Sequence, residues 1–215
     1  MKSYVWSASL LALTVASSAA PAAADEPVHV RGTITTVTAS SFTVTTAKGP
    51  VEVAVSTGVK FAGALPATIA DIKPGTFIGS ANVGSPGAAR ALEVVVFPAA
   101  MKGTGEGDYP WDLPAPGGAH SAMTNGTVAA PHMTSMTNAT VTGMSTGATR
   151  VFSVSYKGGT KRIAVAPNTP IVRLEPGTKA LLHDGAHVFV VAVPSEGAMS
   201  ARVVVVGEHG AVPPM

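Results

Sequence analysis

The chain has 215 residues, and its charge is nearly balanced, with 14 Lys and Arg against 12 Asp and Glu and no Cys. The absence of Cys excludes disulfide cross-links and thiolate-based metal or nucleophile chemistry. Charged residues make up only 12% of the chain and form no basic stripe, so we do not expect nucleic-acid binding.

The first 24 residues have the pattern of a secretory signal peptide. Lys2 supplies a positive start, residues 5–15 are apolar, and small residues lead to Ala24. Such a segment is removed on export, so we expect the mature protein in the bacterial periplasm or, alternatively, secreted. No later stretch reaches the roughly 18–20 apolar residues that a membrane-spanning helix needs, and we therefore expect no membrane span.

The rest of the chain contains two copies of one sequence repeat. Residues 42–97 match residues 152–207 at a constant offset of 110 without a gap, so that Gly75 falls on Gly185. This duplication predicts two small domains of the same fold, joined by a linker rich in Gly, Pro and Met. The expected division is a first domain at 28–98, a linker at 99–135 and a second domain at 136–208.

Most of the first copy is predicted to form β-strands. Apolar and polar residues alternate, as is typical of strands with one buried face. The expected strands are 28–37, 42–46, 51–55, 76–83 and 91–97. Between the third and fourth, residues 65–72 predict one or two helical turns, which Pro74-Gly75 end.

This order of elements is that of an OB-type five-stranded barrel. The sequence therefore predicts an all-β fold with two tandem OB-like five-stranded small barrels, each with a short helix between strands 3 and 4. An open β-sandwich is the alternative, because strand order alone does not show closure.

The second copy follows the same plan, but the position of its first strand is ambiguous. Residues 123–128 (MTNGTV) recur as residues 136–141 (MTNATV), and either could open the copy. We place the strand at 140–144, because Thr142-Gly143 then aligns with Arg31-Gly32 after a one-residue shift. The other strands are expected at 152–156, 162–165, 188–193 and 202–206.

No catalytic motif is present in the sequence. It has no Gly-x-Ser-x-Gly elbow, no phosphate-binding loop and no His-Glu-x-x-His. Glu106, Asp108 and Asp112 form an acidic group, but a Pro- and Gly-rich segment gives no rigid frame for acid–base chemistry. We interpret these three as solvated loop carboxylates and expect the protein not to be an enzyme.

Metal-ligating side chains gather between residues 120 and 144. Imidazole and thioether groups suit copper, and thioether favours Cu(I). The alternative is that the Met side chains pack on the end of a barrel. The candidate copper ligands are His120, Met123, His132, Met133 and Met136. His183 and His187 flank a turn, and we expect both to face solvent.

Tyr109 and Trp111 lie beside Pro110 in the expected linker, where no local core explains them. Aromatic side chains with polar tips are common where a segment packs on a domain and also at partner interfaces. These two residues therefore either dock the linker onto a barrel or mark a partner-binding spot.

Several stretches resemble a large family of bacterial exported β-domains of unknown function. They are residues 30–34 (VRGTI), 41–44 (SFTV) and 72–75 (IKPG), although Thr76 stands where that family usually has Asp. The linker and the second copy are similar to a proteobacterial two-domain subgroup, some members of which are labelled metal-transporter components. These motifs are strand and turn signatures, so the resemblance implies a fold and carries over no catalytic residue.

Together these observations predict a non-catalytic periplasmic binding or assembly module, whose partner is an unknown envelope protein or a small ligand. The alternatives are a soluble copper-type metal-binding accessory of a metal transport system and a structural envelope protein.

Overall fold

The computed structural model describes residues 26–129, 149–195 and 198–213, and within them the fold is all-β. Single 3-10 turns are the only helical elements of these residues, and no helix in them is long and apolar enough to span a membrane. The strands are β1 (Val28–Val37), β2 (Ser41–Thr46), β3 (Gly49–Ala54), β4 (Lys60–Pro66), β5 (Phe77–Val83), β6 (Ala89–Val96), β7 (Gly107–Trp111), β8 (Ser121–Val128), β9 (Arg150–Tyr156), β10 (Gly159–Val165), β11 (Ile171–Gly177), β12 (His187–Ser195) and β13 (Ala198–Gly207).

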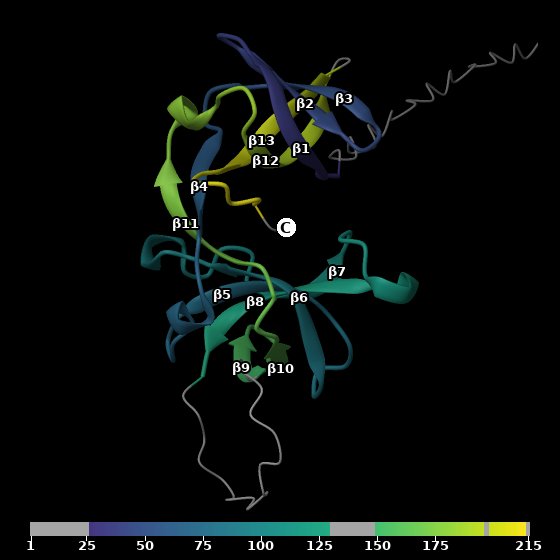
Figure 1. Ribbon diagram of the computed structural model, residues 1–215, viewed down its shortest axis with the longest axis vertical. Helices are drawn as coiled ribbons and strands as arrows, with labels where there is room; N and C mark the ends of the chain where they lie inside the picture. The colour runs from purple at the N-terminus through teal and green to yellow at the C-terminus, as the bar shows by residue number, and fades with distance from the viewer. Residues whose placement is uncertain (1–25, 130–148, 196–197, 214–215) are drawn as a thin grey trace, which may run out of the picture.

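One closed circuit of five strands, here called the upper barrel, contains β1, β2, β3, β13 and β12 (Figure 1). Its neighbouring strands are antiparallel except at one seam. There β13 runs parallel to β3, with Met199 opposite Val53 and Ser200 opposite Ala54. Side chains at alternate positions fill the interior, as in any small barrel, and Ile34, Phe42 and Val190 are among those fully buried.

A second circuit, the lower barrel, contains β8, β9, β10, β6 and β5 (Figure 1). It closes through an equivalent parallel seam between β10 and β6, where Ile163 lies opposite Ala89 and Ala164 opposite Arg90. The two circuits therefore repeat each other strand for strand. Their apolar interiors are separate clusters, with Ile78 and Ile163 in the lower one.

Each barrel is assembled from both copies of the repeat. The upper barrel takes three strands from the first copy and two from the second, and the lower barrel does the reverse. Strand pairing thus crosses the expected division into domains at 28–98 and 136–208. Matching strands of the two copies share one strand pattern, so a strand of either copy can take the same place in a barrel. Interior positions that differ favour the exchanged pairing, because Asn82 of the first copy donates a hydrogen bond to Thr124 of the second. Such exchange of identical elements is the principle of domain swapping.

Two strands that the sequence did not predict, β4 and β11, carry the chain between the barrels. They pair antiparallel with each other, from Val172 opposite Pro66 to Gly177 opposite Phe61. On their outer edges β4 pairs with β13 and β11 pairs with β6. The two expected helices are shorter in the structure than the sequence predicts, because strand pairing extends to Pro66 in β4 and to Gly177 in β11. Each crossing strand leads into a single 3-10 turn, η1 (Ile69–Asp71) after β4 and η4 (Lys179–Leu181) after β11.

A third apolar cluster, here called the interbarrel cluster, fills the space between the two circuits. It contains side chains from strands of both barrels and from the crossing strands. Its buried members are Ala62, Ala64, Phe77, Val95, Phe97, Val172, Leu174, Phe189, Val205 and Ala211. Because burial of each large side chain contributes about 1.5–3 kcal/mol, this cluster holds the barrels together as one packed unit.

The first strand of the second copy is β8, not the later segment that we favoured. β8 pairs with β5 and β9, as β1 pairs with β12 and β2. Gly32 and Gly126 hold the same position, since a Cβ on either would overlap a backbone carbonyl oxygen of the next strand. The expected strand at 140–144 lies outside the described residues. The expected linker, 99–135, instead contains β7 and β8.

Candidate functional site

The candidate site is a cavity of about 470 Å³ along the β7–β8 ribbon. β7 pairs antiparallel with β8, from Gly107 opposite Asn125 to Trp111 opposite Ser121. It extends outward from the lower barrel (Figure 1). The cavity is lined by Asp108, Tyr109, Pro110, Trp111, His120, Ser121 and Ala122. Two groups of residues that the sequence singled out separately, the Tyr109/Trp111 pair and His120, therefore meet in one place.

Trp111 is docked against the upper barrel. Its ring centroid lies 4.4 Å from that of His29 and 6.4 Å from that of Phe189, and it packs against the interbarrel cluster. The Arg31 guanidinium carbon lies 5.9 Å from the ring centroid of Trp111, within the range of a cation–π contact. The structure thus shows the docking arrangement for Trp111, while a partner-binding role for Tyr109 and Trp111 stays a prediction.

An ion-pair clamp holds the carboxyl end of β7. Asp112 accepts hydrogen bonds from Arg31 Nη1 at 3.0 Å and Nη2 at 2.7 Å, and its Oδ1 lies 3.0 Å from His29 Nδ1. Partial burial raises the pKa of Asp112, but the hydrogen bonds from Arg31 and His29 outweigh this effect and lower the pKa to about 2. The clamp connects the end of β7 to β1 of the upper barrel.

A buried polar chain holds the other end of β7 from inside the lower barrel. Lys161 Nζ donates to Asp108 Oδ1 at 2.8 Å and to Oδ2 at 3.1 Å. Thr124 Oγ1 donates to Asp108 Oδ1 at 2.8 Å and accepts a hydrogen bond of 2.9 Å from Asn82 Nδ2. The Lys161 side chain is only 3% exposed, so the pairing with Asp108 is important for stability, because an unpaired buried charge is costly.

These contacts correct our interpretation of the acidic group. Asp108 and Asp112 are not simply solvated loop carboxylates, since each is engaged with a cation on a different barrel. Asp108 is 22% exposed, so it also lines the cavity while Lys161 balances its charge. β7 is therefore fixed at both ends, and the cavity is preorganised.

The polar chain is specific to the lower barrel, and comparison of the two copies reveals it. Ser80, Asn82, Thr124 and Lys161 are all buried. The equivalent upper-barrel residues are Val190, Ala192, Val30 and Val51. Four aligned interior positions are thus polar in the lower barrel and apolar in the upper barrel, two of them in each copy of the repeat. This signal lay in the sequence, and reading the repeat for differences as well as matches could have found Lys161.

The copper candidates are not brought together by the described residues. His120 is exposed and directly precedes β8, whereas Met123 lies within β8 and is only 2% exposed. His132, Met133 and Met136 lie outside the described residues. Within the described ranges, no group of three or more His, Asp or Glu side chains is placed to hold a metal ion.

A second cavity, of about 290 Å³, is bordered by His183, His187, Glu208 and His209. Both His183 and His187 are exposed, as the sequence predicted. His187 Nδ1 lies 3.3 Å from Thr33 Oγ1, and His183 Nδ1 lies 2.9 Å from the Asp184 carbonyl oxygen. Both contacts are local hydrogen bonds at the protein surface.

Three comparisons with known proteins, against family models, curated proteins and solved structures, returned no match. The geometry of the cavity is therefore the guide to function. Its walls offer two aromatic side chains, one imidazole and a carboxylate already paired with Lys161. This set of groups is suited to binding a ligand, because aromatic walls with a few polar groups are typical of ligand sites.

Proposed function

We propose that the chain is a non-catalytic binding or assembly module of the bacterial periplasm, built on OB-like barrels, with the β7–β8 cavity as its ligand site. The observation that carries this proposal is the convergence of Tyr109, Trp111 and His120 on one cavity. Its volume of about 470 Å³ falls within the range of about 300–1,000 Å³ that is usual for ligand sites. The ligand is a small molecule or an exposed segment of an envelope protein.

The polar groups of the cavity define what the ligand must offer. Tyr109 OH accepts a hydrogen bond of 3.1 Å from Asn125 Nδ2, which orients the hydroxyl. Burial raises the pKa of Tyr109, so the phenol stays neutral at pH 7 and can donate a hydrogen bond. The His120 ring can donate or accept. A ligand with an apolar face and a hydrogen-bond acceptor at its edge matches these groups best.

The attachment of β7 at both ends supports a binding role. Asp108 is held by Lys161 of the lower barrel and Asp112 by Arg31 of the upper barrel. The Ser121 hydroxyl lies within hydrogen-bond distance of the carbonyl oxygens of Trp111 (3.0 Å) and Leu113 (2.7 Å) and shares its one proton between them. A site held rigid before binding loses less entropy when the ligand arrives.

An NMR screen of the whole chain against small aromatic compounds, sugars and envelope peptides tests the proposal. We expect binders to shift the Trp111 indole resonance, and we expect Tyr109→Ala and His120→Ala to weaken their affinity about tenfold or more. His187→Ala, an exposed histidine outside this cavity, is the matched control and should bind normally. Ligands whose affinity is the same in all three variants would show that the cavity is not the site.

The alternative, a copper-binding accessory, now rests on His132, Met133 and Met136. β8 separates His120 from the segment that follows residue 129, and eight strand residues span about 26 Å. Titration of the whole chain with Cu(I) against a chromogenic chelator tests this alternative. It requires one tightly bound ion that is lost in a variant combining His132→Ala, Met133→Leu and Met136→Leu. An unchanged affinity in that variant excludes the alternative.

A further inference from the structure

A second candidate binding surface lies on the outer face of the lower barrel, away from the β7–β8 cavity. It is a groove of about 350 Å³ across β9, β10 and the start of β6. Its apolar lining consists of four alanines and one larger side chain: Ala88, Ala89, Ala164, Ala166 and Val151. Val151 is 53% exposed, which makes it one of the few large apolar side chains on the described surface.

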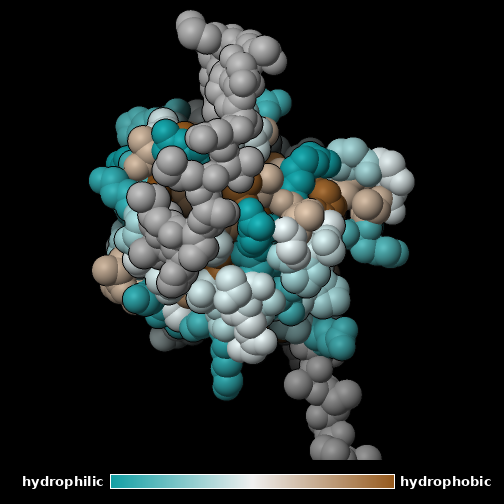
Figure 2. All heavy atoms as spheres, turned by 90° about the horizontal axis from the view of Figure 1, so that it is seen from below, coloured by the Kyte–Doolittle hydropathy of each residue, from teal (hydrophilic) through white to brown (hydrophobic). Residues whose placement is uncertain are grey.

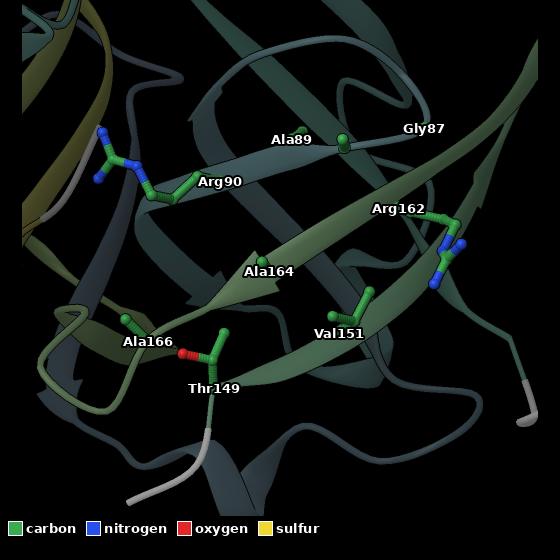
Figure 3. Close-up of a pocket in the computed structure, with 9 residues that line it drawn as sticks. Gly87, Ala89, Arg90, Thr149, Val151, Arg162, Ala164 and Ala166 are labelled. Atoms are coloured by element: carbon green, nitrogen blue, oxygen red, sulfur yellow. The ribbon is translucent and has the colours of Figure 1, made fainter. Parts of the chain in front are cut away.

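Two arginines border this apolar lining. Arg90 follows Ala89 on β6 and Arg162 precedes Ala164 by two residues on β10, and their guanidinium groups lie at opposite ends of the groove (Figure 3). Neither side chain forms an ion pair with another described residue. The backbone N–H of Arg162 donates to the Pro86 carbonyl oxygen at 2.8 Å, which fixes the strand that carries it.

The upper barrel provides an internal comparison for this surface. At the positions equivalent to Arg90 and Arg162 it has Ser200 and Glu52. The two surfaces are formed by equivalent strands and equivalent parallel seams, β10–β6 and β13–β3, yet only the lower one has the pair of cations. The positive charge is therefore not a requirement of the fold, because the same fold forms with a serine and a glutamate there.

The charge, more than the apolar exposure, distinguishes this groove. In the view from below, the described residues present mostly polar and weakly apolar side chains, with strongly apolar ones in small separate areas (Figure 2). Arginine binds carboxylates in bidentate fashion, so an acidic ligand complements the ends of the groove. Because no aromatic side chain among the described residues lines it, these residues offer no ring on which nucleobases or sugar rings could stack.

We propose that this groove binds an extended polypeptide segment of a partner protein, with an acidic side chain on each side of a short apolar stretch. The openness of the groove to solvent, and its two cations at opposite ends, fit a chain with two anions better than a lipid with a single headgroup. Arg90 lies opposite Ala164, so two residues of β10, about 7 Å, separate it along the strand from Arg162. Carboxylates two to four positions apart in an extended peptide are about 7–13 Å apart. This spacing matches the two guanidinium groups, because the side chains of Arg90 and Arg162 point toward opposite ends of the groove.

A synthetic peptide with the sequence Gly-Ser-Asp-Ala-Val-Ala-Asp-Ser-Gly, blocked at both ends, is the probe. Its matched control replaces both Asp with Asn. In an NMR titration of the whole chain we expect the Asp peptide to shift the resonances of Val151 and Ala164, and the Asn peptide to bind about tenfold more weakly or not at all. Addition of salt should weaken the Asp peptide.

Variants of the chain complete the test. Arg90→Gln and Arg162→Gln should each weaken the Asp peptide about fivefold to tenfold, while Glu52→Gln on the upper barrel should not. Because both arginines are exposed, these variants should fold normally, as circular dichroism would verify. Tyr109→Ala should leave peptide binding unchanged, which separates this surface from the proposed β7–β8 site.

Three outcomes would overturn the proposal. The first is equal affinity for the Asp and Asn peptides, and the second is binding of the Asp peptide that neither arginine variant changes. The third is an absence of shifts in the groove at millimolar peptide. Shifts in the same residues caused by octanoate but not by the Asp peptide would assign the groove to an aliphatic anion and would also count against a polypeptide partner.

Discussion

Removal of either partner of the Lys161–Asp108 pair tests how β7 is held on the lower barrel. Lys161 points into the barrel interior with 3% of its side chain exposed, while Asp108 is 22% exposed. Asp108→Ala leaves the buried ammonium group without its only carboxylate among the described hydrogen bonds. Lys161→Met instead leaves a carboxylate that retains Thr124 and some contact with water.

The expected losses of stability depend on these exposures. Breaking a buried ion pair by removing one partner costs about 3–5 kcal/mol, and Asp108→Ala should lie in that range. Lys161→Met should cost less, about 2 kcal/mol, because the remaining carboxylate is partly hydrated. The double variant removes both charges and should be less destabilised than Asp108→Ala alone. The two substitutions are therefore expected to couple by about 1–3 kcal/mol.

Urea unfolding of the wild type, both single variants and the double variant gives the four free energies that this cycle needs. Quenching of Trp111 fluorescence by acrylamide reports the detachment of β7 and should rise most in Asp108→Ala. Additive losses within about 0.5 kcal/mol, or unchanged protection of Trp111 in Asp108→Ala, would refute the view that the pair attaches β7.

The clamp at Asp112 gives a prediction about pH. Its pKa of about 2, lowered from 3.8, means that the stability it contributes is present above about pH 4 and is lost as the pH falls through 2. Because its side chain is 50% exposed, we expect Asp112→Ala to cost only about 1 kcal/mol at pH 7 after solvent screening. The urea midpoints of wild type and variant should converge near pH 2, and a difference that persists there would contradict this assignment. The approach of β8 to β9 gives a second prediction, since a Cβ at Gly126 would overlap the Ser155 carbonyl oxygen. Gly126→Ala should lower the thermal midpoint by several degrees, corresponding to about 2 kcal/mol or more. Gly87→Ala, where a Cβ meets open space, should be nearly neutral, and equal losses in the two variants would be evidence against this packing.

The sequence predicted local strands well where alternation was clear. The expected strand at 42–46 corresponds to β2, and the one at 91–97 lies within a residue or two of β6. It did not predict β4 and β11, because their neighbours come from distant parts of the chain, and no period within seven residues reveals them. It also could not predict which copy completes which barrel. Part of the preference for the exchanged pairing lies in interior positions that differ between the copies, because the hydrogen bond between Asn82 and Thr124 joins strands of different copies.

The sequence singled out Tyr109, Trp111 and His120, but it did not indicate which residues pack around them. Tyr109 and Trp111 were recognisable because aromatic side chains beside Pro110 lacked a local core. Their neighbours could not be inferred, since His29, Arg31 and Phe189 reach Trp111 from strands of opposite ends of the chain. The sequence does not reveal the role of Asp108, because its partner Lys161 lies in the second copy of the repeat, more than fifty positions away. Long-range ion pairs leave no periodic trace in a single sequence.

The exchange of strands has a consequence for how the protein is made. A ribosome releases β1, β2 and β3 first, but the strands that close their circuit, β12 and β13, end at Gly207. β1, β2 and β3 therefore lack the strands that close their barrel, and have unpaired edges exposed, until synthesis is nearly complete. The lower barrel, whose strands end at Val165, can close sooner and give the nascent chain a folded platform. Shortening the gene at the boundary between the repeats would leave two halves, neither of which holds a complete circuit.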